Sequence, residues 1–372
     1  MSNPYLELAA PGVKGLQPYQ PGKPISELER EYGVPNIIKL ASNENPLGPG
    51  RAARAAMERE IAQVARYPDG GGYELKAALA ARHSIDAARI TLGNGSNDVL
   101  VLLAEAFLTP ETEAVYSEYA FAVYPIAVQA VGARARVAPA YPRDHAASPL
   151  GHDLHAMAQC LNGRTRLVFI ANPNNPTGTW LERADLRSFV ERVPQHALVV
   201  IDEAYFDYVD EPEYPDTTRW LDDFPNLVVT RTFSKAFGLA GVRAGYALSA
   251  PGVADLLNRV RQPFNLNSLA QAAAVAALGD NAHLERSREL NRRGLEEIAS
   301  YCEAFGLGFA PSIGNFVLVD FGRPALPVYE ALLREAVIVR PVGNYGLPNH
   351  LRISVGLPEE NERLTAALRK VL

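Results

Sequence analysis

The sequence has the length and composition of an ordinary globular protein. Its 372 residues are too many for one small core, so we expect two domains or one large domain with a smaller unit. The formal net charge of −6 and the lack of a Lys/Arg block argue against nucleic acid as a partner. No apolar run approaches a membrane span and no signal segment is recognisable, so we expect a soluble, cytoplasmic protein without a membrane partner.

Cysteine and histidine give no sign of a metal site. Cys160 and Cys302 are isolated, which supplies neither a disulfide framework nor a zinc spacing and fits a reducing compartment. His152 and His155 stand three residues apart, but they lie in a polar, Pro-rich stretch where we expect them to be solvated. We therefore expect no metal.

From about residue 50, helical segments alternate with short β-rich runs, a pattern typical of a mostly parallel sheet covered on both faces. We expect helices near residues 51–65, 73–83, 97–108, 120–131, 153–160 and 182–192. We expect strands near residues 89–92, 112–116, 133–138, 166–170, 197–201, 226–231 and 244–248. The pattern predicts a three-layer α/β/α domain.

The pattern changes after about residue 265 and predicts a smaller α+β unit. Its expected elements are a helical region over 267–305, strands near 315–319, 337–340 and 350–355, and helices near 326–335 and 359–371. The first 45 residues are rich in Pro, Gly and Asn and are expected to form an extended arm with one short helix. We predict a large cofactor-binding domain over 46–264, with 1–45 and 265–372 forming the arm and small domain.

The segment from Thr232 to Tyr246 places one lysine directly after an apolar strand. The amine of Lys235 can form a Schiff base with a carbonyl, which an arginine cannot do because it does not deprotonate. Arg243, among glycines eight residues on, suits bidentate capture of a phosphate. Together they suggest pyridoxal phosphate as cofactor. The alternative is a surface lysine in a Gly-rich loop.

Three further motifs follow predicted strands, where ligands bind in open α/β sheets. Gly93–Asp98 opens a helix, whose free N–H groups favour a phosphate, although an ordinary capped helix fits equally. Asn175 lies in a turn that two prolines and a glycine make rigid. Asp202 ends a β-branched strand and needs a partner if buried; a protonated pyridine nitrogen would serve.

The motif at Asp202 has a rival interpretation. Asp202 and Glu203 could hold a metal after a strand, as in ATPases, but the G-x-x-x-x-G-K-[ST] phosphate loop is absent. Tyr205, three residues after Asp202, could donate a hydrogen bond to the phenolate oxygen of the cofactor.

The ordered set Asn175, Asp202, Tyr205, Lys235 and Arg243 resembles the fold-type-I aminotransferases, and most closely the histidinol-phosphate aminotransferase family. The resemblance covers essentially the whole chain, including 16–23, 41–46, 66–68 and 345–354. It implies that Lys235 carries the cofactor and shuttles the proton, that Asp202 pairs with the ring nitrogen, and that Asn175 and Tyr205 bond the phenolate oxygen.

The resemblance also implies a phosphate cup, a dimer and an aromatic ring stacked on the cofactor. The cup would consist of Gly95, Ser96, Asn97, Thr232, Ser234 and Arg243. Tyr67 would reach the cofactor phosphate of the neighbouring subunit, which implies a homodimer with shared active sites. Tyr119 would stack on the ring, although it lacks the family's usual preceding proline; Phe121 and Tyr124 are the alternatives.

For the substrate, the resemblance assigns Arg352 and Arg340 to the acidic group and Tyr19 to closure of the arm. The implied reaction is transamination of L-histidinol phosphate with 2-oxoglutarate, giving imidazole acetol phosphate and L-glutamate, in histidine biosynthesis. An aromatic amino-acid aminotransferase or a phospho-amino-acid decarboxylase of the same fold is the alternative. A DNA-binding regulator would need an N-terminal winged-helix domain, for which the chain has no room.

Overall fold

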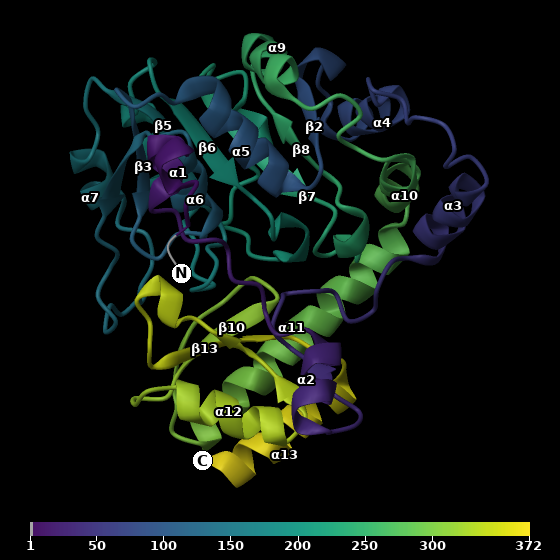
Figure 1. Ribbon diagram of the computed structural model, residues 1–372, viewed down its shortest axis with the longest axis vertical. Coiled ribbons are helices and arrows are strands. Elements are labelled where there is room, and N and C mark those ends of the chain that lie inside the picture. Colours follow the sequence, from purple (N-terminus) through teal and green to yellow (C-terminus); the bar gives the residue numbers. More distant parts are fainter. Residues whose placement is uncertain (1–2) are drawn as a thin grey trace.

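The computed structural model describes residues 3–372, which form a larger and a smaller unit (Figure 1). The larger unit contains a seven-stranded sheet of order β2-β8-β7-β6-β5-β3-β4. Its strands are β2 (Ile90–Gly93), β3 (Glu113–Ser117), β4 (Arg134–Ala138), β5 (Thr165–Ala171), β6 (Leu198–Asp202), β7 (Leu227–Thr232) and β8 (Gly245–Leu248). From β4 to β7 all neighbours are parallel, whereas β8 is antiparallel to β7 and β2.

Both faces of this sheet are covered by helices. These are α3 (Arg51–Ile61), α4 (Tyr73–His83), α5 (Ser96–Phe107), α6 (Val123–Ala130), α7 (Leu154–Gln159), α8 (Arg183–Arg192), α9 (Pro251–Val260) and α10 (Ser268–Leu278). Successive strand residues point to opposite faces, so Val168 and Ile170 pack with α4, α8 and α10, while Leu167 and Phe169 pack with α5 and α6. The predicted three-layer α/β/α class is confirmed. Helix α9 was not anticipated.

The smaller unit is built on a four-stranded antiparallel sheet of order β12-β13-β10-β9. Its strands are β9 (Gly308–Ala310), β10 (Phe316–Asp320), β12 (Arg340–Pro341) and β13 (His350–Ser354). Its helices are α2 (Ile25–Tyr32), α11 (Asn281–Ala304), α12 (Leu326–Arg334) and α13 (Pro358–Val371).

The N-terminal arm belongs to both units. Its β1 (Ile38–Lys39) pairs in parallel with β11 (Val337–Ile338) of the smaller unit, whereas its short helix α1 (Pro11–Lys14) lies against α6 of the larger unit. The arm therefore crosses the boundary between the units.

The helical region expected over 267–305 is two helices. The helical region is interrupted at Gly279 and Asp280. There the Asp280 side chain accepts a hydrogen bond from the backbone N–H of His283 and caps the start of α11. Helix α10 packs on α3 and α4 because its alanine-rich face is buried there, and α11 runs on into the smaller unit (Figure 1). By packing, α10 thus belongs with the larger sheet, although the prediction assigned it to the small domain. The limits 46–264 and 265–372 stay predictions.

A buried ion pair joins the ends of β6 and β7. The Nε and Nη2 atoms of Arg231 donate to Glu203 Oε2 at 2.8 and 2.6 Å, and Nη2 also donates to Asp216 Oδ1 at 2.7 Å. Both Arg231 and Glu203 are almost fully buried. Because they adjoin Asp202 and Thr232 on neighbouring strands, the pair fixes the sheet edge that carries the predicted site residues.

We expect Glu203→Gln to lower the free energy of unfolding by about 3 kcal/mol, because the buried Arg231 would then keep only the partly exposed Asp216 as a counter-charge. Asp255→Asn serves as the control, because it breaks the exposed Asp255–Arg259 pair of 2.7 Å and should cost less than about 0.5 kcal/mol. Urea unfolding followed by circular dichroism measures both. Equal effects of the two substitutions would contradict the role given to the buried pair.

Candidate active site

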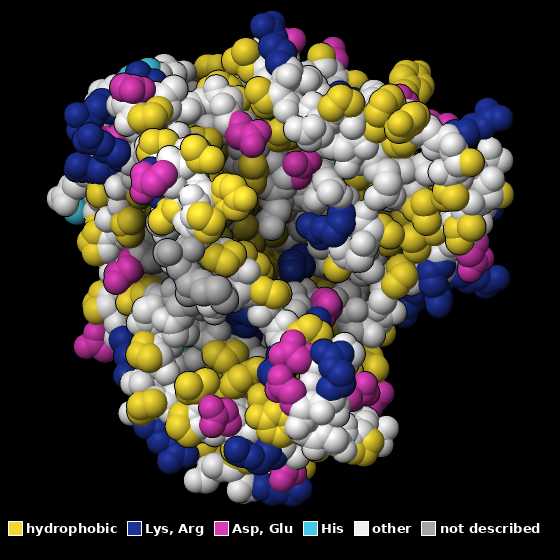
Figure 2. All heavy atoms as spheres, viewed as in Figure 1, with side chains coloured by type: hydrophobic (Ala, Val, Ile, Leu, Met, Phe, Trp, Pro, Cys, Tyr) yellow, Lys and Arg dark blue, Asp and Glu magenta, His cyan; other side chains and the backbone are white. Residues whose placement is uncertain are grey.

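A cavity of about 200 Å³ lies where strands β5, β6 and β7 end, facing the smaller unit. Figure 2 shows a hollow between the two units with Lys and Arg side chains in its wall. The predicted site residues that line the cavity are Tyr19, Ser96, Asn97, Asn175, Asp202, Tyr205, Thr232, Ser234, Lys235, Arg243, Arg340 and Arg352. Asn175, Asp202 and Lys235 meet because the carboxyl ends of parallel strands share one edge of the sheet. Arg340 and Arg352 reach the cavity from the smaller unit, and Tyr19 reaches it from the N-terminal arm.

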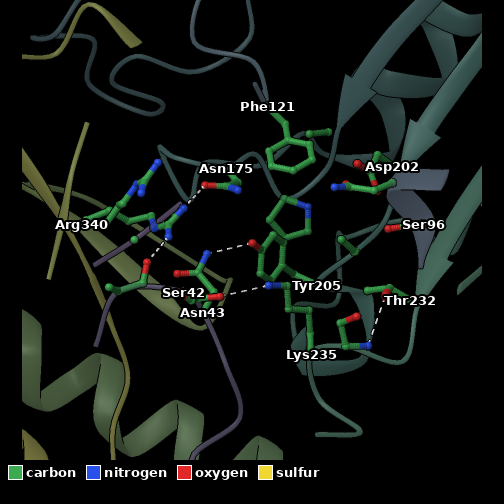
Figure 3. A pocket seen from close by; sticks show the side chains of 18 of the residues that line it. Ser42, Asn43, Ser96, Phe121, Asn175, Asp202, Tyr205, Thr232, Lys235 and Arg340 are labelled. Carbon is green, nitrogen blue, oxygen red and sulfur yellow. Dashed lines mark hydrogen bonds between the residues drawn. The ribbon is translucent and has the colours of Figure 1, made fainter. Parts of the chain in front are cut away.

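Lys235 lies in the turn after β7, and its Nζ donates a hydrogen bond to the backbone oxygen of Ser42 at 3.3 Å (Figure 3). The pKa of Lys235 is lowered to about 7, mainly by burial and next by the charge of Arg352. Asp202 and Glu44 oppose these effects only in part. A sizeable fraction of the amine is therefore neutral near pH 7 and can act as a nucleophile or a base.

Asp202 ends β6 with its carboxylate buried. The hydroxyl of Tyr124 donates to Oδ2 at 2.9 Å, and that of Thr230 donates to Oδ1 at 3.1 Å. Burial raises the pKa of Asp202, and these hydrogen bonds act in the opposite direction. Tyr124 had been considered only as a stacking residue; the structure stacks it on Phe169, with centroids 4.8 Å apart, and gives its hydroxyl to Asp202. A cationic ligand group suits this carboxylate.

Tyr205 and Asn175 are each held by a partner that sequence analysis had not paired with them. The Nδ2 of Asn43 donates to the Tyr205 hydroxyl oxygen at 2.8 Å. The Nη1 of Arg352 donates to Asn175 Oδ1 at 2.6 Å, so the amide N–H groups of Asn175 remain available to the cavity.

One end of the cavity suits a phosphate. Ser96 and Asn97 begin α5, and Arg243 Nη1 donates to Ser234 Oγ at 3.1 Å. Gly95 does not line the cavity, but a Cβ there would lie 2.3 Å from Arg243 Nη2. Only glycine therefore lets the guanidinium lie against the start of α5, where free N–H groups and the helix dipole also favour an anion.

The opposite end carries two arginines on paired strands. Arg340 of β12 and Arg352 of β13 are opposite each other in register. Arg352 Nη2 donates to the Ala41 oxygen at 2.6 Å, while its buried Nε has no hydrogen-bond partner among residues 3–372. Arg340 Nη2 donates to the oxygen of Gln20, and its Cζ lies 5.8 Å from the centroid of the half-exposed Tyr19 ring. A second anion therefore fits here.

Two predicted aromatic residues lie outside the cavity. Tyr119 packs on the hydrophobic cluster around Leu150 and Leu347, because the turn after β3 directs it toward the smaller unit. Phe121, one of the alternatives, lines the cavity instead (Figure 3). Tyr67 is 83% exposed and stacks on Phe264 with centroids 4.8 Å apart. The structure thus places Phe121, and not Tyr119, beside the other site residues.

The expectation that His152 is solvated is wrong. The side chain is 3% exposed, its Nε2 lies 3.0 Å from the Ala171 oxygen, and burial lowers its pKa to about 4. Glu203 uses Oε1 for Thr217 and Oε2 for Arg231, so it does not pair with Asp202 as a metal ligand. Within residues 3–372 no three His, Cys, Asp or Glu side chains are grouped to hold a metal ion. No helix in that range is long and apolar enough to cross a membrane.

Comparison with known proteins identifies the family. The profile described as "Aminotransferase class I and II" matches residues 35–368. The chain belongs to the class I and II aminotransferases. It is 57% identical to histidinol-phosphate aminotransferase 2 of Methylococcus capsulatus over 366 residues, 98% of each chain. The like-named protein of Pseudomonas aeruginosa is 57% identical over 370 residues, covering 99% of this chain and 98% of its own.

Solved structures agree with this assignment. The histidinol-phosphate aminotransferase of Sinorhizobium meliloti in complex with pyridoxal-5'-phosphate superposes with a TM-score of 0.88 at 29% identity. The match covers 97% of this chain and 96% of that one. The fold inferred from the alternating strands and helices is therefore that of the aminotransferase family.

We expect Lys235 in the cofactor-free protein to react with a small amine-specific acylating reagent at a half-maximal rate near pH 7, since only the neutral amine is nucleophilic. A lysine of ordinary pKa, about 10.4, would be almost fully protonated there. Peptide mapping by mass spectrometry after short labelling at each pH gives the profile. A half-maximal rate above about pH 9 would show that the cavity does not lower this pKa.

Proposed function

We propose that the cavity binds pyridoxal phosphate, held covalently by Lys235, and that the chain is a histidinol-phosphate aminotransferase. The reaction would transfer the amino group of L-histidinol phosphate to 2-oxoglutarate, giving imidazole acetol phosphate and L-glutamate. The observation that carries the proposal is the buried amine of Lys235, which shares one cavity with the buried carboxylate of Asp202 and with arginines at both ends. The names of the relatives and the cofactor of the Sinorhizobium structure support it.

The residues of the cavity fit this cofactor. Asp202 would pair with the ring nitrogen, Asn175 and Tyr205 would donate to the phenolate oxygen, and Phe121 would cover a ring face. The phosphate would be held by Gly95, Ser96, Asn97, Thr232, Ser234 and Arg243. When bound, the cofactor supplies an electron-accepting ring that stabilises negative charge formed at the substrate Cα.

The chain's own part in the reaction is proton transfer and charge control. With substrate bound, Lys235 Nζ would accept the proton from the substrate Cα and return it during the same half-reaction. The pKa near 7 places this base close to neutral pH. Asp202, fixed by Tyr124 and Thr230, keeps a negative charge aimed at the ring nitrogen.

Arg340 and Arg352 account for the two unlike substrates. A guanidinium binds a phosphate and a carboxylate with the same two-pronged geometry, so one pair can hold histidinol phosphate or glutamate. The energy of binding this remote anion orients the Cα–H bond toward Lys235. Tyr19, beside Arg340, would close over the bound substrate.

A half-reaction tests the substrate. We expect L-histidinol phosphate to bleach the visible absorbance of the holoenzyme more than about tenfold faster than phenylalanine, since a phosphate offers the two arginines more charge and more acceptor oxygens than the single carboxylate of phenylalanine. Stopped-flow absorbance with saturating amino donor measures this, and phosphothreonine tests for decarboxylation. A faster reaction with phenylalanine would assign the chain to the aromatic aminotransferases, and carbon dioxide release from phosphothreonine to the decarboxylases.

We also propose that the enzyme is a cytoplasmic homodimer. Large apolar side chains that follow or precede Tyr67 closely in the sequence, or stack on it, are exposed, as a dimer contact would require. They are Ile61, Val64, Tyr73 and Phe264. A second copy covering this surface would bring Tyr67 to the phosphate of its partner's cofactor. The isolated cysteines suit the reducing cytoplasm.

Mixed dimers test whether sites are shared. Alone, we expect Lys235→Ala to be inactive and Tyr67→Ala to be strongly impaired. When the two chains are refolded together, we expect roughly one quarter of wild-type activity to return. Half of the randomly paired dimers are mixed, and each mixed dimer has one complete site. The control mixes either variant with itself. No recovery above the Tyr67→Ala level would place Tyr67 in its own subunit's site or outside it.

A further inference from the structure

Three consecutive residues of the N-terminal arm contact three different site residues. The Ala41 oxygen accepts from Arg352 at 2.6 Å, and the Ser42 oxygen accepts from Lys235 at 3.3 Å. Asn43 contacts Tyr205 through its side chain, as the dashed line in Figure 3 shows. Asn43 is the only one of the three that acts through its side-chain amide, so its contact depends on residue type.

The orientation of the Asn43 amide follows from hydrogen-bond accounting. The backbone N–H of Asn43 donates to Ser354 Oγ at 2.9 Å, so the single hydrogen of that hydroxyl must go elsewhere. It goes to Asn43 Oδ1, also at 2.9 Å. With Oδ1 toward Ser354, Nδ2 faces Tyr205; the flipped amide would leave the hydrogen of the buried Ser354 hydroxyl without an acceptor, so the network favours this orientation.

This orientation decides the role of the Tyr205 hydroxyl. Its oxygen accepts a hydrogen bond from Asn43 Nδ2 at 2.8 Å, so its own hydrogen is free to be donated to an acceptor in the cavity. Burial raises the pKa of Tyr205, which keeps that hydrogen in place over the working range of the enzyme. Tyr205 is therefore set as a donor toward the cavity.

The backbone at Asn43 explains why asparagine suits this position. Its φ is +54°, in the left-handed region that asparagine and glycine tolerate better than other residues. The side chain is 1% exposed, so each polar atom needs a partner, and Ser354 and Tyr205 supply both. Glycine would keep the backbone but lose the amide, which makes it a clean substitution.

We propose that Asn43 is a positioning residue which, together with Ser354, fixes the hydrogen-bond polarity of Tyr205 so that Tyr205 donates to the phenolate oxygen of the cofactor. This inference rests on the proposed function. Ser354 lies two residues after Arg352 on β13, so the strand that holds the substrate anion also sets the electronic environment of the cofactor.

A pH titration of the visible absorbance of the holoenzyme tests the inference. A hydrogen bond donated to the phenolate oxygen stabilises its negative charge and lowers the pKa of the chromophore. We expect Asn43→Gly to weaken that bond and raise the chromophore pKa by about 0.5 to 1 pH unit. Asn43→Asp should raise it at least as much, because a carboxylate only accepts and would take the Tyr205 hydrogen.

Asn36→Gly is the matched control, because Asn36 is an exposed asparagine of the same arm with a φ of +55°. It should leave the chromophore pKa unchanged. Tyr205→Phe should raise the pKa, and adding Asn43→Gly to it should have no further effect, which a merely structural role would not produce.

The outcomes separate this inference from the proposed function. If Tyr205→Phe shifts the chromophore pKa while both Asn43 variants titrate like the wild type, the role given to Asn43 is overturned and the proposed function stands. If the wild-type chain acquires no visible chromophore with pyridoxal phosphate, the proposed function fails and the inference with it. Ser354→Ala, which frees the amide to flip, should shift the pKa in the same direction as Asn43→Gly.

Discussion

The chemistry of this site depends on the poor solvation of the buried Lys235 amine. Among residues 3–372 its one hydrogen-bond acceptor is a backbone oxygen at 3.3 Å, and two arginines that line the same cavity disfavour a positive charge. The amine is therefore partly neutral near pH 7. In the proposed function the same arginines would bind the anionic ends of the ligands, so they would both attract substrate and activate the nucleophile.

The fold makes this arrangement possible by converging strand ends. Strands β5, β6 and β7 are buried on both faces and parallel, so Asn175, Asp202 and Lys235 arrive at one edge although they are widely separated in sequence. The buried Glu203–Arg231 pair joins the ends of β6 and β7 at that edge. Arg340 and Arg352 come from the smaller unit, and the arm segment 41–43 joins both halves through hydrogen bonds.

Sequence reasoning located the sheet and the strand-end motifs because both depend on local signals. Apolar runs predicted β5 to β7, and the polar turns after them predicted Asn175, Asp202 and Lys235. It expected Tyr119 to stack on the cofactor, whereas Phe121, two residues later in the turn after β3, is the side chain that lines the cavity.

The contacts that sequence reasoning missed are long-range. Tyr124 reaches Asp202 and Asn43 reaches Tyr205 only after the chain has folded, and nothing in the local pattern marks these pairs. The polar sequence around His152 suggested a solvated side chain. In the structure the side chain is buried, and its Nε2 contacts the backbone oxygen of Ala171. The alanine-rich helix α10 had no periodic signal strong enough to assign it to either unit.

Reduction of the holoenzyme with borohydride, followed by peptide mapping, tests the central claim most directly. Reduction makes the bond between a lysine amine and the cofactor aldehyde permanent. The account predicts that the cofactor mass is found on the peptide containing Lys235 and that Lys235→Ala acquires no label. Label on another lysine, or a wild-type chain that retains none, would contradict it.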